Sequence, residues 1–286
     1  MRPRFTVGAV ILLATGAVVV GLRATRYSPQ AVRPDNAAGD ATCLSCHGQN
    51  ASYEESAHRL TSRLPTRAAI LGSFRHGENV LRTSNPSLYF HMDSTASGFF
   101  ETAVIGRAPD TSVRMERIAF VTGLRKGQSY LYWHGDRLYQ LPISYWRDIG
   151  WVNSPSYADG RPNFERPIPP RCLECHATAF ESLPDPVLVN RYRPTGARLG
   201  ISCETCHGAG REHVGRERSP LRAVLPPAIV NPARLPRERQ LRRLRPLSQW
   251  DRPASNRAIL VCAWAAPREA IHPLRGTGYD PTRRAR

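Results

Sequence analysis

The sequence lacks a recognisable nucleic-acid-binding motif, although its formal net charge of +17 would be enough to attract a polyanion. Its basic residues are nearly all arginine, and they are concentrated in the last third of the chain. From Leu241 onward ten arginines face three acidic residues, so +7 of the total charge belongs to the final 46 residues. We therefore expect no nucleic-acid partner.

A clean small-x-small cleavage site is also missing near the N-terminus, which otherwise has the pattern of an export signal. An uncharged apolar run from Phe5 to Leu22 follows Arg2 and Arg4. Its length of about 18 residues lies at the short end for a membrane-spanning helix. We expect residues 1–25 to be a signal peptide or membrane anchor rather than a core helix, and residues 26–39 to be a linker. The rest should be extracytoplasmic, in the periplasm, either free or anchored to the inner membrane.

Six of the seven cysteines lie in a repeated pentad, Cys-x-x-Cys-His. The three copies are Cys43-Leu44-Ser45-Cys46-His47, Cys172-Leu173-Glu174-Cys175-His176 and Cys203-Glu204-Thr205-Cys206-His207. This spacing is the attachment motif for c-type haem, because two thiols reach the two vinyl groups of one porphyrin edge and the adjacent histidine binds the iron. We therefore expect three covalent haems, with His47, His176 and His207 as proximal ligands.

Other uses of paired cysteines fit the pentads less well. Structural zinc would need closed sets of four ligands, and the first pentad stands far from the other two. A redox dithiol or a disulfide puts no constraint on the next residue. None of these alternatives explains a histidine directly after every second cysteine.

Methionine is scarce, which bears on the second axial position of each iron. Only Met92 and Met115 lie inside the chain. Six histidines lie outside the pentads: His58, His76, His91, His134, His213 and His272. Because the second ligand of a haem iron is commonly His or Met, this supply favours bis-His coordination and low reduction potentials.

His58 and His213 are the candidate distal ligands. His58 lies in a helix-compatible stretch, Tyr53 to Leu60, just after the first pentad, and His213 closely follows the third pentad. Short tethers of this kind let a side chain reach a neighbouring haem, although a surface or hydrogen-bonded histidine stays an alternative for each. The histidines expected to have no haem role lie in segments with β character: His76, His91 and His134.

Between the first and second pentads the chain changes to alternating β-forming residues. Strand-like runs cover residues 117–122 and 129–134, and Gly135-Asp136 before residues 137–141 is a hairpin signal. We expect an α+β fold, a loop-rich multihaem cytochrome c with an antiparallel β-insert whose aromatic residues are mostly core. The expected segments are a first haem segment at residues 40–70, a β-rich insert at 71–166, the second and third haem segments at 167–240 and a basic tail at 241–286.

Several motifs between about Thr42 and Gln240 carry a resemblance to a known family. They are Ser56-Ala57-His58, Tyr139-Gln140-Leu141-Pro142-Ile143, the second pentad with Ala177-Thr178, and Gly200-Ile201-Ser202 before the third pentad with His213 after it. Together they resemble the tetrahaem cytochrome c-554 family, which includes bacterial forms fused to tetratricopeptide repeats. The resemblance implies His58 and His213 as distal iron ligands. The chain departs from the family in having no fourth pentad near Arg239 and no tetratricopeptide pattern.

The family character stops near Gln240, where a tail rich in Arg, Pro and Leu begins. Residues 244–251 can be encoded by codons that spell Cys-Ala-Pro-Cys-His-Ser-Gly when read one base later. We therefore hypothesise that the chain is truncated or frame-shifted after three haem motifs, with a fourth haem in the full-length parent and no haem role for Cys262 or His272. The alternative is a genuine, disordered basic tail. The nucleotides of codons 244 to 250 decide between the two.

Taken together, these features predict an extracytoplasmic cytochrome that transfers electrons between other redox proteins or quinol-linked membrane complexes. An alternative is an oxidoreductase that reduces a small nitrogen or sulfur oxyanion at a haem with an open axial position. All three pentads are ordinary, so the sequence shows no such catalytic haem. A third possibility makes the β-insert a docking module and haem a redox sensor.

Overall fold

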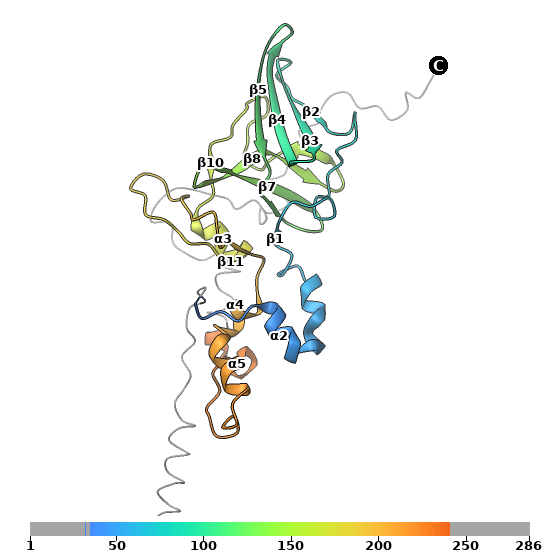
Figure 1. The fold of residues 1–286 in the computed structure, drawn as a ribbon. Helices are drawn as coiled ribbons and strands as arrows, with labels where there is room; N and C mark the ends of the chain where they lie inside the picture. The colour runs from blue at the N-terminus through green and yellow to red at the C-terminus, as the bar shows by residue number, and fades with distance from the viewer. Residues whose placement is uncertain (1–31, 33–34, 241–286) are drawn as a thin grey trace, which may run out of the picture. The chain divides into compact units, whose positions relative to one another are not determined.

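The computed structural model describes residue 32 and residues 35–240 (Figure 1). The expected signal peptide or anchor, residues 26–31 and 33–34 of the expected linker, and the basic tail lie outside the described residues, as do Cys262 and His272. In the described part of the chain, no helix is both long enough and apolar enough to span a membrane.

Short helices and antiparallel sheets alternate along the described chain, which confirms the expected α+β class. The helices are α2 (Asp40–Cys46), α3 (Pro170–His176), α4 (Cys203–His207) and α5 (Arg211–Glu217), with 3-10 helices η1 (Gly48–Glu55) and η2 (Pro232–Arg234). The strands are β1 (Ser62–Arg63), β2 (Val80–Arg82), β3 (Leu88–Thr95), β4 (Gly98–Arg107), β5 (Asp110–Arg117), β6 (Phe120–Thr122), β7 (Gly127–His134), β8 (Arg137–Trp146), β9 (Gly150–Asn153), β10 (Arg166–Pro167), β11 (Ala177–Ala179) and β12 (Arg198–Leu199).

The strands between the first and second pentads form two larger sheets. One has the order β2-β3-β4-β5, and the other has the order β1-β6-β7-β8-β10 with β9 also pairing with β8. Strands β11 and β12 form a separate small sheet between the second and third pentads. Neighbouring strands in all three sheets are antiparallel.

The predicted hairpin at Gly135-Asp136 is present between β7 and β8. His134 pairs with Arg137, which leaves a two-residue turn, and Gly135 has a φ of 61°. Two-residue hairpins that follow the natural strand twist need a positive φ at this position, and glycine adopts it without steric strain.

The prediction of one strand over residues 117–122 is wrong. Strand β5 ends at Arg117 in one large sheet, and β6 begins at Phe120 in the other. Between them Ile118 donates its N–H to Phe99 O (2.9 Å), and Ala119 donates its N–H to Leu131 O (2.8 Å). The chain therefore passes from one sheet to the other at these two residues, although their side chains continue the β pattern.

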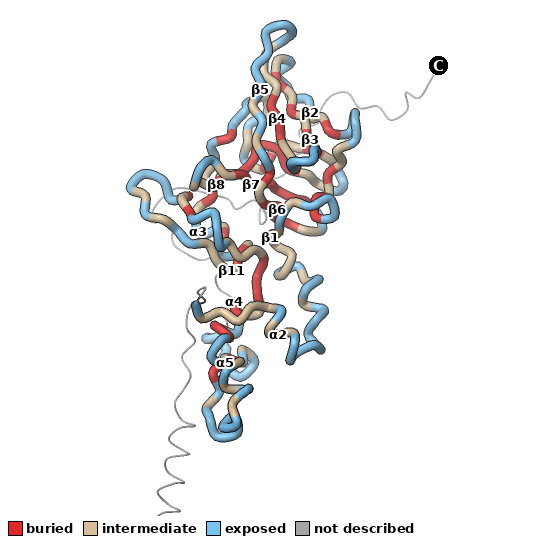
Figure 2. Tube along the Cα trace, viewed as in Figure 1, coloured by how far each residue is buried: buried red, intermediate tan, exposed pale blue. Residues whose placement is uncertain are grey.

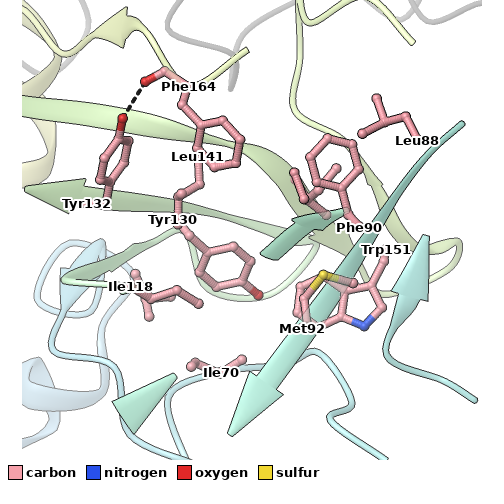
Figure 3. Close-up of a cluster of buried hydrophobic side chains, with 13 residues drawn as sticks. Ile70, Leu88, Phe90, Met92, Ile118, Tyr130, Tyr132, Leu141, Trp151 and Phe164 are labelled. Carbon is pink, nitrogen blue, oxygen red and sulfur yellow. Dashed lines mark hydrogen bonds between the residues drawn. The ribbon is translucent and has the colours of Figure 1, made fainter. Parts of the chain in front are cut away.

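The main core lies between the two larger sheets. Figure 2 shows buried residues concentrated in β4, β7 and β8, whereas the turn between β4 and β5 is exposed. Phe90, Met92, Tyr130 and Trp151 gather in this core (Figure 3), and the Tyr132 hydroxyl donates to Phe164 O (2.6 Å). Burial of these large side chains is the main source of stability for this part of the fold.

A second buried cluster joins the second pentad to the β7-β8 sheet. Leu173 of α3 packs there with Phe120, Leu138 and Tyr192, and Cys172 packs against the same cluster. Ring contacts extend it through Trp133 and Phe180, whose centroids each lie 5.7 Å from that of Phe120. The helix that carries the second pentad is therefore fixed to the sheet by apolar contacts.

Glu101 places a fully buried carboxyl group inside the main core. Its Oε1 accepts a hydrogen bond from Ile143 N (2.9 Å), which links β4 to β8 across the two sheets. Its Oε2 is buried and has no hydrogen-bond partner in the described chain. Burial raises the pKa of Glu101 well above its ordinary value of 4.5, because the charged form is poorly solvated there.

This burial predicts a pH-dependent effect of Glu101→Gln. Because the pKa of Glu101 is raised in the folded chain, the wild type loses stability as pH rises above about 4.5. Above that pH the carboxyl group is charged and hydrated in the unfolded chain, whereas folding buries it where the charged form is poorly solvated. Glutamine keeps the acceptor for Ile143 N and has no charge to lose. Chemical denaturation should show the free energy of unfolding of the variant, relative to the wild type, increasing by about 1–3 kcal/mol between pH 5 and pH 8. The exposed Glu165→Gln is the control, and an equal difference at both pH values would contradict the account.

Candidate cofactor-binding site

Each of the three pentads lies on a short helix. The two cysteines of a pentad are three residues apart, so one helical turn puts both thiols on the same face. The histidine ends the helix in α3 and α4, and in α2 it is the residue that caps the C-terminus. No disulfide involves the six cysteines of the described chain. Each of the three pentads therefore holds two thiols and one imidazole close together.

The first and third pentads are held side by side by reciprocal hydrogen bonds between α2 and α4. Asp40, the first residue of α2, accepts from Cys203 N, the first N–H of α4 (3.0 Å). Glu204 in turn accepts from Ala38 N (2.8 Å) and Gly39 N (3.3 Å), just before α2. Because helix N-termini have free N–H groups and a positive dipole, each acidic side chain stabilises the start of the other helix.

Glu204 is the most constrained charged residue of the site, with only 1% of its surface exposed. Besides Ala38 and Gly39, it accepts from Arg198 Nη2 (2.7 Å) and from Gly210 N (2.8 Å). Burial alone would raise the pKa of Glu204, but these donors together lower it below its ordinary value. The carboxylate therefore stays charged and joins the starts of α2 and α5 to β12.

The rings of His47 and His213 lie near each other with nearly parallel planes. Their centroids are 6.4 Å apart and their planes differ by 17°. Two imidazoles bound to opposite sides of one metal ion have centroids about 6 Å apart, because each contributes a bond of about 2 Å plus the distance from nitrogen to ring centre. The centroid separation of His47 and His213 is therefore of the size that two imidazoles on one metal ion would have.

His213 lies in α5 and also comes close to the third pentad. Burial lowers the pKa of His213, and the nearby His47 and His207 lower it further. Glu217 partly offsets these effects by raising it. Neutral imidazole is the form that binds a metal, so this lowered pKa favours ligation.

The histidines of the second and third pentads each have one ring nitrogen engaged. His176 Nδ1 lies 2.9 Å from Thr61 Oγ1, and His207 Nδ1 lies 2.9 Å from Val230 O. In metal-binding histidines the nitrogen that does not bind the metal usually donates to such an acceptor. Nε2 is then the nitrogen available to an iron in both pentads.

The remaining predicted histidines are placed differently. His58 lies in turns after η1, where a helix had been expected, and its side chain is exposed. Its carbonyl accepts from Ile201 N (3.0 Å), so its backbone lies next to the start of α4. His91 has both ring nitrogens engaged, by Asp93 Oδ1 (2.7 Å) and Asn79 Nδ2 (2.9 Å). The two exposed histidines of the β-rich part are His76 and His134.

Three residues of this site have roles that the sequence analysis missed. They are Asp40 and Glu204, which join the first and third pentads, and Thr61, which contacts His176. The signal available for the first two was an acidic residue in or just before a pentad. Thr61 has no local signal, because its partner is 115 residues away.

One comparison with known proteins found a match to this chain. The family described as cytochrome c554 and c-prime matches residues 152–208, which contain the second and third pentads. No curated protein and no solved structure matches the chain. The match supports a cytochrome c family for the chain, and such a family implies covalently bound haem c. The paired thiols and the neighbouring His47 and His213 fit that group.

The buried carboxylate predicts a specific loss in Glu204→Gln. The new amide NH2 would face a hydrogen-bond donor, either Arg198 or a backbone N–H, so charge-assisted bonds are lost and the remainder are misdirected. We expect the free energy of unfolding to fall by about 1.5–3 kcal/mol in chemical denaturation.

Glu174→Gln is the matched control, because Glu174 is an exposed glutamate within the second pentad. It should leave stability unchanged within about 0.5 kcal/mol. Equal effects of the two substitutions would show that Glu204 does not hold the helices together.

Proposed function

We propose that this chain is an extracytoplasmic multihaem c-type cytochrome that transfers electrons between redox partners. Three haems would attach through Cys43 and Cys46, Cys172 and Cys175, and Cys203 and Cys206. Bound haem c supplies a one-electron Fe(III)/Fe(II) couple. The proposed proximal ligands are His47, His176 and His207.

The closeness of His47 and His213 is the observation that carries this proposal. If His47 and His213 both held one iron, that iron would have no position for a substrate and would be suited to electron transfer. The 6.4 Å separation of the two rings supports that assignment for the first pentad. For the third pentad we propose His58 as distal ligand, since its backbone lies beside α4.

Asp40 and Glu204 contribute by keeping two attachment sites adjacent. Their reciprocal bonds join the first turns of α2 and α4, so the first and third haems would be held close enough for direct electron exchange. A rigid link also limits reorganisation when the charge of one centre changes. We propose redox proteins or quinol-linked membrane complexes as partners and the periplasm as location. A fourth haem in a full-length parent stays part of the proposal.

The axial pair predicts the effect of His213→Ala. Removing the distal ligand should convert one haem from low spin to high spin and let it bind carbon monoxide, while covalent attachment stays intact. Absorption and electron paramagnetic resonance spectra of the mature protein measure this. His134→Ala is the control, because His134 is exposed on β7. An unchanged spectrum in His213→Ala would remove His213 from the ligands.

The same spectra distinguish electron transfer from the alternative function. Rapid binding of carbon monoxide or nitrite by the wild-type protein would reveal an open iron position. That result would favour an oxidoreductase acting on a small nitrogen or sulfur oxyanion over pure electron transfer.

A further inference from the structure

Thr61 precedes the β-insert in the sequence, yet it contacts the histidine of the second pentad, which follows the insert. Its Oγ1 lies 2.9 Å from His176 Nδ1, and the two residues are 115 positions apart. Both residues are half-buried. The His176 ring is therefore held against the Thr61 side chain.

The backbone around Thr61 is fixed by its neighbours on several sides. Thr61 O accepts from Gly123 N (2.9 Å), and Ser62 pairs with Thr122 in the β1–β6 ladder. Ser62 is 3% exposed, donates its hydroxyl to His176 O and accepts from Gly200 N (3.0 Å). Gly200 has a φ of +68°, and a Cβ there would lie 2.0 Å from Arg59 O. The segment before β1 is thus tightly packed against both the end of α3 and the approach to α4.

The chemistry of the contact follows from which nitrogen binds iron. If Nε2 of His176 is the ligand, Nδ1 keeps its hydrogen and donates it to the Thr61 hydroxyl. Such a bond orients the imidazole and makes it a stronger electron donor. Better donation stabilises Fe(III) relative to Fe(II) and lowers the reduction potential. In the third pentad the corresponding acceptor is the carbonyl of Val230, a backbone group that no side-chain substitution removes.

We propose that Thr61 is a positioning residue that orients His176 and lowers the reduction potential of the haem on the second pentad. This inference rests on the proposed function, because it assumes that a haem is attached at Cys172 and Cys175. The segment before β1 would thereby help to set the reduction potential of the haem on the second pentad. The first and third pentads should be independent of it, because their histidines do not contact Thr61.

The test is a spectroelectrochemical titration of the mature, full-length protein carrying Thr61→Val. Valine keeps the β-branched shape and removes the acceptor. One midpoint potential should rise, by an amount equivalent to a threefold to tenfold change in the oxidised-to-reduced ratio, where tenfold is about 59 mV for one electron. Thr61→Ser keeps the hydroxyl and should restore the wild-type potential. Thr66→Val is the matched control, because Thr66 is exposed and its hydroxyl accepts from Ala69 N (3.1 Å) in the same segment.

A Cys172→Ala, Cys175→Ala double variant identifies the redox transition that belongs to the second pentad. If that variant loses no haem, the proposed function fails at this pentad. If the haem is present and its potential is the same in Thr61→Val as in the wild type, only the role of Thr61 is overturned. Thr61→Ala makes the same test should the valine variant not mature. A shift shared by Thr61→Val and Thr61→Ser would also contradict the proposal, because it would reflect packing rather than the hydroxyl.

Discussion

The buried carboxylate of Glu204 is the interaction on which the arrangement of the pentads depends. A charge that is 1% exposed is tolerated only when hydrogen bonds replace its hydration, and here Ala38, Gly39, Arg198 and Gly210 supply them. These donors belong to the chain before α2, to β12 and to the start of α5. One side chain of α4 therefore fixes the positions of β12 and of the starts of α2 and α5 relative to one another. Helix α2, which His47 caps, and helix α5, which contains His213, both begin at this carboxylate.

The second pentad is held by different forces. Its helix packs on the β-sheet through Leu173 and a group of aromatic side chains, and its histidine is hydrogen-bonded to Thr61. Charge and backbone capping thus organise the first and third attachment sites, whereas apolar burial organises the second. This division gives the β-insert a physical purpose in the proposed cytochrome, since it provides the platform for α3.

The chemistry of the site could be predicted from the sequence more fully than its architecture. The pentads are local patterns whose spacing is set by the cofactor, and Gly135-Asp136 is a local turn signal, so both could be recognised directly. The change of sheet at Ile118 could not, because alternating side chains do not reveal which neighbour a strand pairs with. The role of Glu204 was hidden for a similar reason. Its partner Ala38 is 166 residues away, and only the folded chain brings them together.

The most direct test of the central claim is the mass of the mature protein, followed by mapping of its peptides. The account predicts a chain that carries three covalent haems, with one on each peptide containing Cys43 and Cys46, Cys172 and Cys175, or Cys203 and Cys206. A mature chain without added haem mass, whose cysteines hold zinc or form disulfides instead, would contradict it.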